Sequence, residues 1–358
     1  MHLFACAKRA LTCETEISMS THTYAKQNRM DNSASPVDEL PQEPGIVVYT
    51  YATHSQGMMP ILRESAQRYG YRLKVVGFGQ KWRGYCAKLL EMQKCIQKED
   101  DDTLVMCVDA FDVFLCRPAR ELREAFVASG HTFLIGAHRA PVTEALHKLR
   151  FGEFDAVSSA NGSNRDKDAG PYKFLCAGTW MARAADARAI LAHFDQLEAD
   201  MDDQEMFIAL RRRLGENKIT LDRQFQFFAT LSPSLPTWSV DTRDQIAVLR
   251  DRDTNLPLLY SGLTKSQPFV VHGPGHTDLS QLVAKFDFDG TCEPVKRSFI
   301  AKKVFYQTAQ TVGNWALELF AVAFLLAIVA LVTWHLNKKN LSSTVPQSIT
   351  AFGATKVR

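Results

Sequence analysis

Two aspartates three residues apart are the side chains of this sequence that most clearly suggest chemistry. Asp109 and Asp112 lie in the stretch 104–115, LVMCVDAFDVFL, which is otherwise apolar. Such a run predicts a strand buried on both faces, which delivers the following residues to the ligand-binding edge of a parallel sheet. Buried carboxylates are costly unless they are paired, hydrogen-bonded or metal-bound. The spacing therefore indicates a D-x-x-D site for a hard divalent cation that carries a diphosphate. In the alternative interpretation, Asp109 caps a turn and Asp112 is solvated.

Two further groups could join this site. The tripeptide 202–204, Asp-Asp-Gln, stands at a predicted helix start, and His272 and Gly273 follow a short predicted strand. Oxygen ligands suit Mg²⁺ or Mn²⁺, and an imidazole shifts the balance towards Mn²⁺. Gly273 would let the backbone approach phosphate oxygens closely. The structural alternatives are a helix N-cap at Asp203 and a core or surface role for His272.

The elements that must position these residues alternate between strand and helix. Predicted strands and helices follow one another from 45 to 136, which indicates a mostly parallel sheet with right-handed crossovers. The region 174–183 is a short apolar element, and 184–213 is helical in two pieces. The predicted strands are 45–53, 71–76, the run from 104 that leads into Asp109, 131–136, 217–221, 246–249, 257–260 and 268–271, and the early helices are 58–69, 86–98 and one from 118.

Composition limits the function classes. Apolar residues make up 46% of the 358 residues and charged residues 23%, which is typical of a globular protein. A net charge of +3 supports no general affinity for nucleic acid. The eight cysteines are scattered and form no C-x-x-C pair, which argues against a zinc site.

The domain boundaries follow changes of composition. The expected parts are a disordered segment at 1–44, an α/β domain at 45–290, a basic juxtamembrane linker at 291–314, a transmembrane helix at 315–337 and a polar tail at 338–358. Residues 319–337 contain no Asp, Glu, Lys or Arg, and Trp315 and Trp334 stand near the two ends. This pattern predicts a helix that spans a lipid bilayer, with a buried core helix as the alternative. No signal-peptide h-region is expected near the start.

Seven motifs in one order along roughly two-thirds of the chain carry a family resemblance. They are VVYTYAT (47–53), GFGQKWRG (77–84), MCVDAFDVFL (106–115), FLCAGTWMA (174–182), DDQEMF (202–207), ITLDRQFQFF (219–228) and VVHGPG (270–275). Together they resemble the glycosyltransferase domain of the procollagen lysyl hydroxylase/glycosyltransferases (PLOD-like), including viral relatives. The hydroxylase part is expected to be absent, since no H-x-D…H iron triad is apparent. The implied fold is α/β of GT-A type, a Rossmann-like, mostly parallel sheet flanked by helices.

The resemblance implies a role for each matching residue. Asp109, Asp112 and His272 are implied as ligands of Mn²⁺, with Mg²⁺ as the alternative. Asp203, with Asp202 beside it, is implied as the catalytic carboxylate that orients the sugar or the acceptor hydroxyl. The residues implied in nucleotide binding are Thr50 and Trp82 around the uridine, Phe111 where the family stacks a tyrosine, Gly273 beside the phosphates, and Lys88 beyond the W-R-G loop.

The sequence departs from the family pattern near the sugar. Where the family has F-L-N-S-G-G, Cys176 and Ala177 replace an Asn and a Ser that can bond sugar hydroxyls. His138 stands where the family has an acidic residue. Because of these changes, the sequence does not identify which sugar is transferred or which acceptor receives it.

The expected function is transfer of a hexose from UDP-glucose or UDP-galactose to an acceptor hydroxyl, of hydroxylysine type or on a protein-linked glycan. Alternatives are a membrane-anchored transferase acting on a glycan or lipid, an inactive relative that binds UDP-sugar or glycan, and a phosphotransferase, although no P-loop is present. A C-terminal span without a signal peptide predicts a cytosolic domain, whereas the resemblance implies the lumen of the ER or Golgi. The membrane side stays open.

Overall fold

A computed structural model describes residues 45–139, 170–194, 197–234, 239–290 and 327–328. The expected segments 1–44, 291–314 and 338–358 lie outside these ranges, as does all of 315–337 except 327–328. Among the described residues, no helix has the length and apolar character that crossing a membrane requires. The membrane span therefore stays a prediction from the sequence.

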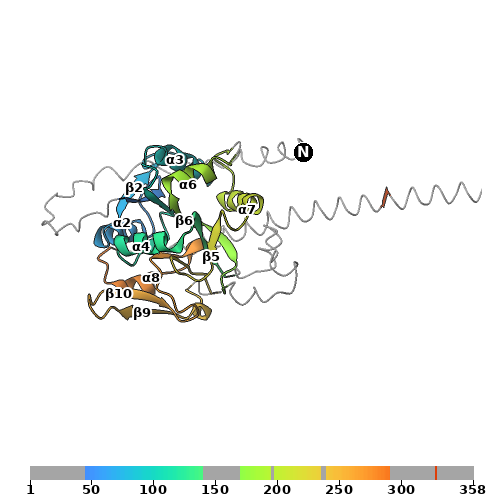
Figure 1. The fold of residues 1–358 in the computed structure, drawn as a ribbon. Coiled ribbons are helices and arrows are strands. Elements are labelled where there is room, and N and C mark those ends of the chain that lie inside the picture. The colour runs from blue at the N-terminus through green and yellow to red at the C-terminus, as the bar shows by residue number, and fades with distance from the viewer. Residues whose placement is uncertain (1–44, 140–169, 195–196, 235–238, 291–326, 329–358) are drawn as a thin grey trace, which may run out of the picture. The chain divides into compact units, whose positions relative to one another are not determined.

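A six-stranded sheet forms the centre of the domain (Figure 1). Its strand order is β2-β1-β3-β6-β5-β7, and β6 is antiparallel to both of its neighbours while the other pairs are parallel. The strands are β1 (Ile46–Tyr51), β2 (Arg72–Val76), β3 (Leu104–Val108), β5 (Phe133–His138), β6 (Phe174–Arg183) and β7 (Thr220–Asp222). The expectation of a mixed α/β fold with a mostly parallel sheet is confirmed.

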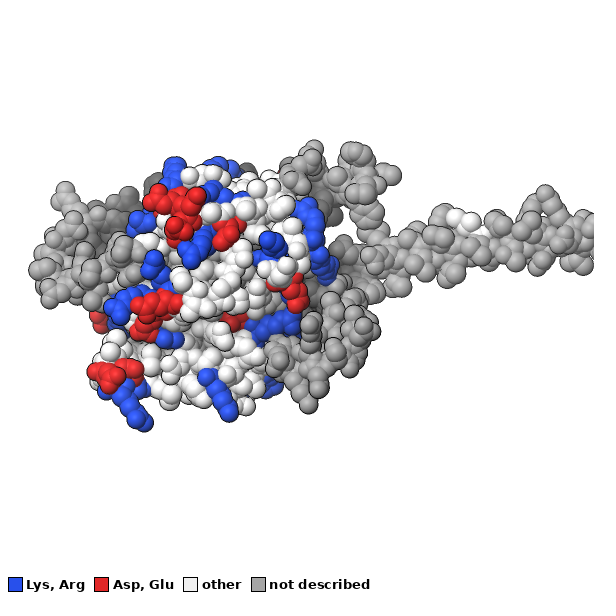
Figure 2. Space-filling model, in the orientation of Figure 1, with Lys and Arg blue, Asp and Glu red and all other residues white. Residues whose placement is uncertain are grey.

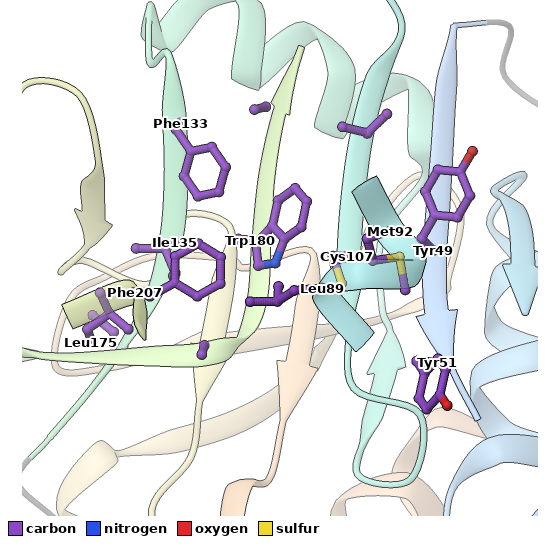
Figure 3. Packing of buried hydrophobic residues seen from close by; sticks show 14 of the residues in the cluster. Tyr49, Tyr51, Leu89, Met92, Cys107, Phe133, Ile135, Leu175, Trp180 and Phe207 are labelled. Carbon is purple, nitrogen blue, oxygen red and sulfur yellow. The ribbon is translucent and has the colours of Figure 1, made fainter. Parts of the chain in front are cut away.

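Helices cover both faces of this sheet. On one face α3 packs over β1, α6 over β3 and β6, and α7 over β6, with alternate strand residues such as Tyr49 and Cys107 in the cluster that Figure 3 shows around Trp180. On the other face α2 and α4 pack over the intervening residues, such as Val48 and Met106. Because successive strand residues point to opposite faces, one apolar run builds both cores. The helices are α2 (Met59–Arg68), α3 (Cys86–Ile96), α4 (Ala119–Ser129), α6 (Ala184–Leu191), α7 (Asp203–Leu214) and the short α8 (Ser280–Val283).

A second, three-stranded sheet stands next to the D-x-x-D turn. Its order is β4-β11-β8, with β11 antiparallel to β4 and parallel to β8. The strands are β4 (Val113–Leu115), β8 (Phe228–Thr230) and β11 (Val270–His272), and a separate hairpin joins β9 (Ile246–Arg250) to β10 (Pro257–Ser261). Single 3-10 turns lie at Thr242–Asp244, Pro274–His276 and Ala284–Phe286. The stretch 104–115 thus forms two strands, β3 and β4, that belong to different sheets. Asp109 and Asp112 lie in the turn between them.

Charged side chains are mixed on the visible face of the described chain. Figure 2 shows basic and acidic residues interspersed there, with no single large basic patch. The mixture agrees with the small net charge of the sequence.

Candidate active site

The structure brings Asp109, Asp112 and His272 together. Their ligand atoms all lie within 4.8 Å of one another. His272 Nε2 is 3.6 Å from Asp109 Oδ2 and 3.6 Å from Asp112 Oδ1. The imidazole is buried, and its Nε2 has no hydrogen-bond partner among the described residues. A buried ring nitrogen that faces two carboxylates fits a hard divalent cation with one nitrogen ligand.

Main-chain hydrogen bonds hold the three ligands in place. The Asp109 amide donates to the Gly178 carbonyl at 2.8 Å, which ties the end of β3 to β6. The Gly273 amide donates to the Asp112 carbonyl at 2.8 Å, and His272 stands opposite Val113 in the β11–β4 ladder. The ligands come from segments far apart in sequence, but the backbone of the two sheets fixes their spacing.

Gly178 leaves the room that the ligands need. A Cβ atom at this position would lie 2.2 Å from His272 Cε1 and 2.6 Å from Asp109 Oδ2. The pairing of β6 with β5 also changes register here, passing from Trp180 directly to Cys176. Such irregularities re-aim side chains beside functional sites. The signal in the sequence was the glycine inside an apolar strand, for which close backbone approach is one reason.

Lys88 links Asp109 of the ligand cluster to the start of α7. Its Nζ lies 2.7 Å from Asp109 Oδ1 and 2.7 Å from Asp203 Oδ2, and the side chain is only 9% exposed. Burial disfavours the charged amine, but the two carboxylates outweigh it and hold the Lys88 pKa well above its usual value. Burial raises the pKa of Asp203, and Lys88 opposes that rise. The sequence placed Lys88 near the nucleotide and missed its two carboxylate partners.

Asp202 and Asp203 take different positions at the start of α7. The alternative interpretation of Asp203 as an N-cap is wrong, because Asp202 is the capping residue and its Oδ1 accepts the amides of Gln204 and Glu205 at 2.9 and 3.4 Å. Asp203 is the first residue of the helix and points inward to Lys88. Of the two carboxylates predicted to be catalytic, Asp203 thus reaches the ligand cluster through Lys88, while Asp202 stabilises the helix.

Gln204 fastens the start of α7 to β6. Its Oε1 accepts the Ala177 amide at 2.9 Å, and its Nε2 donates to the Leu175 carbonyl. This side chain therefore holds the peptide groups on both sides of Cys176. The sequence pointed to Gln204 only as part of its acidic motif, since a contact between distant segments leaves no local pattern.

Aromatic rings are available near the site for a planar ligand. Trp82 is 48% exposed and lies 5.9 Å from the Tyr51 ring and 5.6 Å from the Tyr85 ring. Phe111, between the two aspartates, is half-buried and lies 5.6 Å from the His54 ring. Exposed aromatic faces can stack on a base.

Thr50 and Gly273 are committed to protein contacts. The Thr50 side chain is completely buried, and its hydroxyl donates to the Val108 carbonyl at 2.9 Å, linking β1 to β3. The hydroxyl proton is therefore used within the protein, and the predicted nucleotide contact of Thr50 stays a prediction. The Gly273 amide is already bonded to Asp112, and a Cβ at Gly273 would lie 2.9 Å from Leu279. Gly273 therefore helps to hold the backbone of Asp112 in place, and its predicted phosphate contact stays a prediction.

Comparisons with known proteins confirm the family resemblance. Residues 42–150 match the family model described as the PLOD GT domain. The human multifunctional procollagen lysine hydroxylase and glycosyltransferase LH3 is 27% identical over 252 residues, covering 65% of this chain and 30% of LH3. Mouse procollagen-lysine,2-oxoglutarate 5-dioxygenase 1 is 24% identical over 255 residues, covering 68% of this chain and 32% of the mouse protein. The chain therefore spans about a third of the length of these relatives.

Similar solved structures include the galactosyltransferase LgtC in complex with donor and acceptor sugar analogs. It is 12% identical, with a TM-score of 0.32, and the match covers 63% of this chain and 86% of that one.

Proposed function

We propose that this chain, whose residues 42–150 match the PLOD GT domain, is a metal-dependent glycosyltransferase that moves a hexose from a UDP-sugar to an acceptor hydroxyl. The observation that carries the proposal is the ligand cluster of Asp109, Asp112 and His272. Lys88 contacts Asp109 of this cluster and also Asp203. Within the proposal, the fold is of GT-A type.

Asp109, Asp112 and His272 would hold the cation, with Mn²⁺ favoured by the imidazole and Mg²⁺ as the alternative. When bound, such a cation neutralises a diphosphate leaving group and polarises the bond that breaks. Main-chain hydrogen bonds hold the backbone at Asp109 and Asp112, which favours a fixed spacing of the ligands.

The donor nucleotide would stack on the aromatic rings of Trp82 and Phe111. Both rings keep exposed surface, and Phe111 stands between the two aspartates, which places a stacking surface beside the ligand cluster. The hexose is proposed to be glucose or galactose, as the family resemblance implies.

Asp203 would orient a hydroxyl of the sugar or the acceptor. One of its oxygens is held by Lys88, which favours the charged carboxylate against the effect of burial and fixes its direction. The acceptor is proposed to be hydroxylysine-type or a protein-linked glycan. The predicted bilayer span at 315–337 and an endomembrane location belong to the same proposal, and the apolar run 319–337 favours a membrane-associated glycan or lipid acceptor as the second candidate.

UDP release from a panel of UDP-sugars tests the proposal. The full chain should release UDP from UDP-glucose or UDP-galactose with Mn²⁺ and should lose this activity in excess chelator. Asp112→Asn should lose activity while keeping its circular dichroism spectrum, because an amide is a poor ligand in place of a carboxylate. Asp251→Asn, at a half-buried position whose carboxylate accepts the Thr254 amide in the following turn, serves as the matched control. Full activity of Asp112→Asn would contradict the role of Asp112 as a metal ligand. No turnover with any UDP-sugar would contradict the proposal that the chain is a UDP-sugar transferase.

A further inference from the structure

Cys176 lies against the nitrogen of His272 that faces away from the carboxylates. Its Sγ is 3.6 Å from His272 Nδ1, while Nε2 of the same ring faces Asp109 and Asp112. The thiol is therefore on the far side of the ring from the ligand cluster and cannot share a cation with Nε2. Both the cysteine and the histidine are buried.

The position of the thiol is set by its neighbours. The peptide groups before and after Cys176 are both bonded to the side-chain amide of Gln204. Two residues further along β6, Gly178 approaches His272 so closely that no Cβ would fit. The imidazole thus lies between the Cys176 sulfur and the aspartates, with Gly178 against its Cε1 edge.

A metal-binding histidine must present a bare nitrogen to the cation, so its proton sits on the other nitrogen. That N–H is almost always bonded to an acceptor, which fixes the tautomer and the ring orientation. At His272 the atom in this position is a sulfur, which is a weak acceptor. Within the proposed metal site, on which this inference rests, we propose that Cys176 is the positioning residue of His272 and accepts its Nδ1–H when Nε2 binds the cation.

Mn²⁺ affinity of the full chain, measured from the electron paramagnetic resonance signal of free Mn²⁺, tests this role. Cys176→Ala removes the acceptor and should weaken Mn²⁺ binding about tenfold. Loss of the hydrogen-bond partner of a metal-binding histidine weakens metal affinity about 10–100-fold, and we expect the lower end because sulfur is a weak acceptor. Cys176→Asn restores an acceptor oxygen and should bind within about threefold of wild type. Cys116→Ala is the control, since Cys116 is an equally buried thiol bonded to the Pro268 carbonyl.

A second measurement reports the tautomer and the hydrogen bond of Nδ1. In ¹⁵N-histidine-labelled full chain with saturating Mg²⁺, the His272 signals, assigned by their loss in His272→Gln, should show the proton on Nδ1. Because the bound cation itself keeps the proton off Nε2, Cys176→Ala should keep this tautomer, but its Nδ1–H proton signal should move upfield since the sulfur acceptor is lost. A role in packing alone would change stability and leave this proton signal unchanged.

The outcomes separate the two proposals. If wild type and Cys116→Ala bind Mn²⁺ equally and Cys176→Ala matches them with an unchanged Nδ1–H proton signal, the role of Cys176 is overturned and the metal site stands. Equal losses in Cys176→Asn and Cys176→Ala, or an equal loss in Cys116→Ala, would also overturn it, because packing would then explain the effect. A wild-type chain that binds no Mn²⁺ would overturn the metal site and this inference together.

Discussion

The ammonium group of Lys88 lies 2.7 Å from the carboxylate of Asp203, and both side chains are largely buried. The same ammonium also contacts Asp109, so one cation on α3 links a metal-ligand candidate at the end of β3 to the first residue of α7. Breaking such a pair leaves an uncompensated buried charge. The two sides of the proposed reaction, leaving group and acceptor, thus share one electrostatic partner.

Replacing Lys88 with Met should destabilise the fold by about 3–5 kcal/mol, because Asp203 then stays buried without its cation. Urea denaturation measures the change. Lys94→Met, which breaks only an exposed pair with Glu91, should cost less than about 1 kcal/mol. The double variant Lys88→Met/Asp203→Asn should regain part of the loss, and a loss equal to the sum of the single variants would show that the two groups are not coupled.

The contribution of His272 to the stability of the chelator-treated protein should fall as the pH drops from 6.5 towards 4. Burial lowers the pKa of His272 to about 4, so in this window the unfolded chain binds a proton at this residue that the folded chain does not. The His272 contribution therefore rises with pH, by about 3 kcal/mol over the window. Asp244, whose pKa burial raises to about 6, acts in the opposite direction in both proteins. Denaturation curves at several pH values should show a flatter dependence for His272→Gln. An unchanged slope would mean that His272 does not contribute. His131, whose pKa burial also lowers, stays in both proteins.

Substituting Ala for Gly178 should weaken Mn²⁺ binding more strongly than it weakens the fold. The new methyl would meet His272 and Asp109 at less than contact distance, so one or both ligands must move. Isothermal titration with Mn²⁺ measures the affinity. Gly130→Ala is the control: its Cβ meets nothing within 4 Å, and its positive φ costs about 1–2 kcal/mol of stability. Equal Mn²⁺ affinity in the two variants would show that the ligands do not need the space that Gly178 leaves beside them.

Changing Trp82 to Ala should raise the KM for the UDP-sugar and leave the unfolding free energy nearly unchanged. The ring is half exposed, so little buried surface is lost, whereas stacking on a base contributes about 1–3 kcal/mol. Steady-state kinetics and urea denaturation separate the two effects. Val127→Ala, a similarly exposed apolar residue on α4, should change neither quantity. An unchanged KM for Trp82→Ala would exclude this ring from donor binding.

The sequence alone determined most strands and helices of the domain and the D-x-x-D turn. Local periodicity records which side of each element is buried, and the run before Asp109 could be packed only as a central strand. The sequence also pointed to His272, through its place after a short strand. It left β8 unseen, because three residues hold no readable period, and treated β6 as a short element although it is a ten-residue antiparallel strand.

Only the tertiary structure decided the partners of the polar side chains. Nothing local distinguishes Asp202, which caps α7, from Asp203, which turns inward to Lys88. The Thr50 hydroxyl bonds to the Val108 carbonyl, and the Cys176 thiol lies against His272, because strands distant in sequence become neighbours in the sheets. Hydrophobic spacing specifies a face, whereas the identity of the atom opposite a donor depends on strand order and direction, which emerge when the whole chain packs.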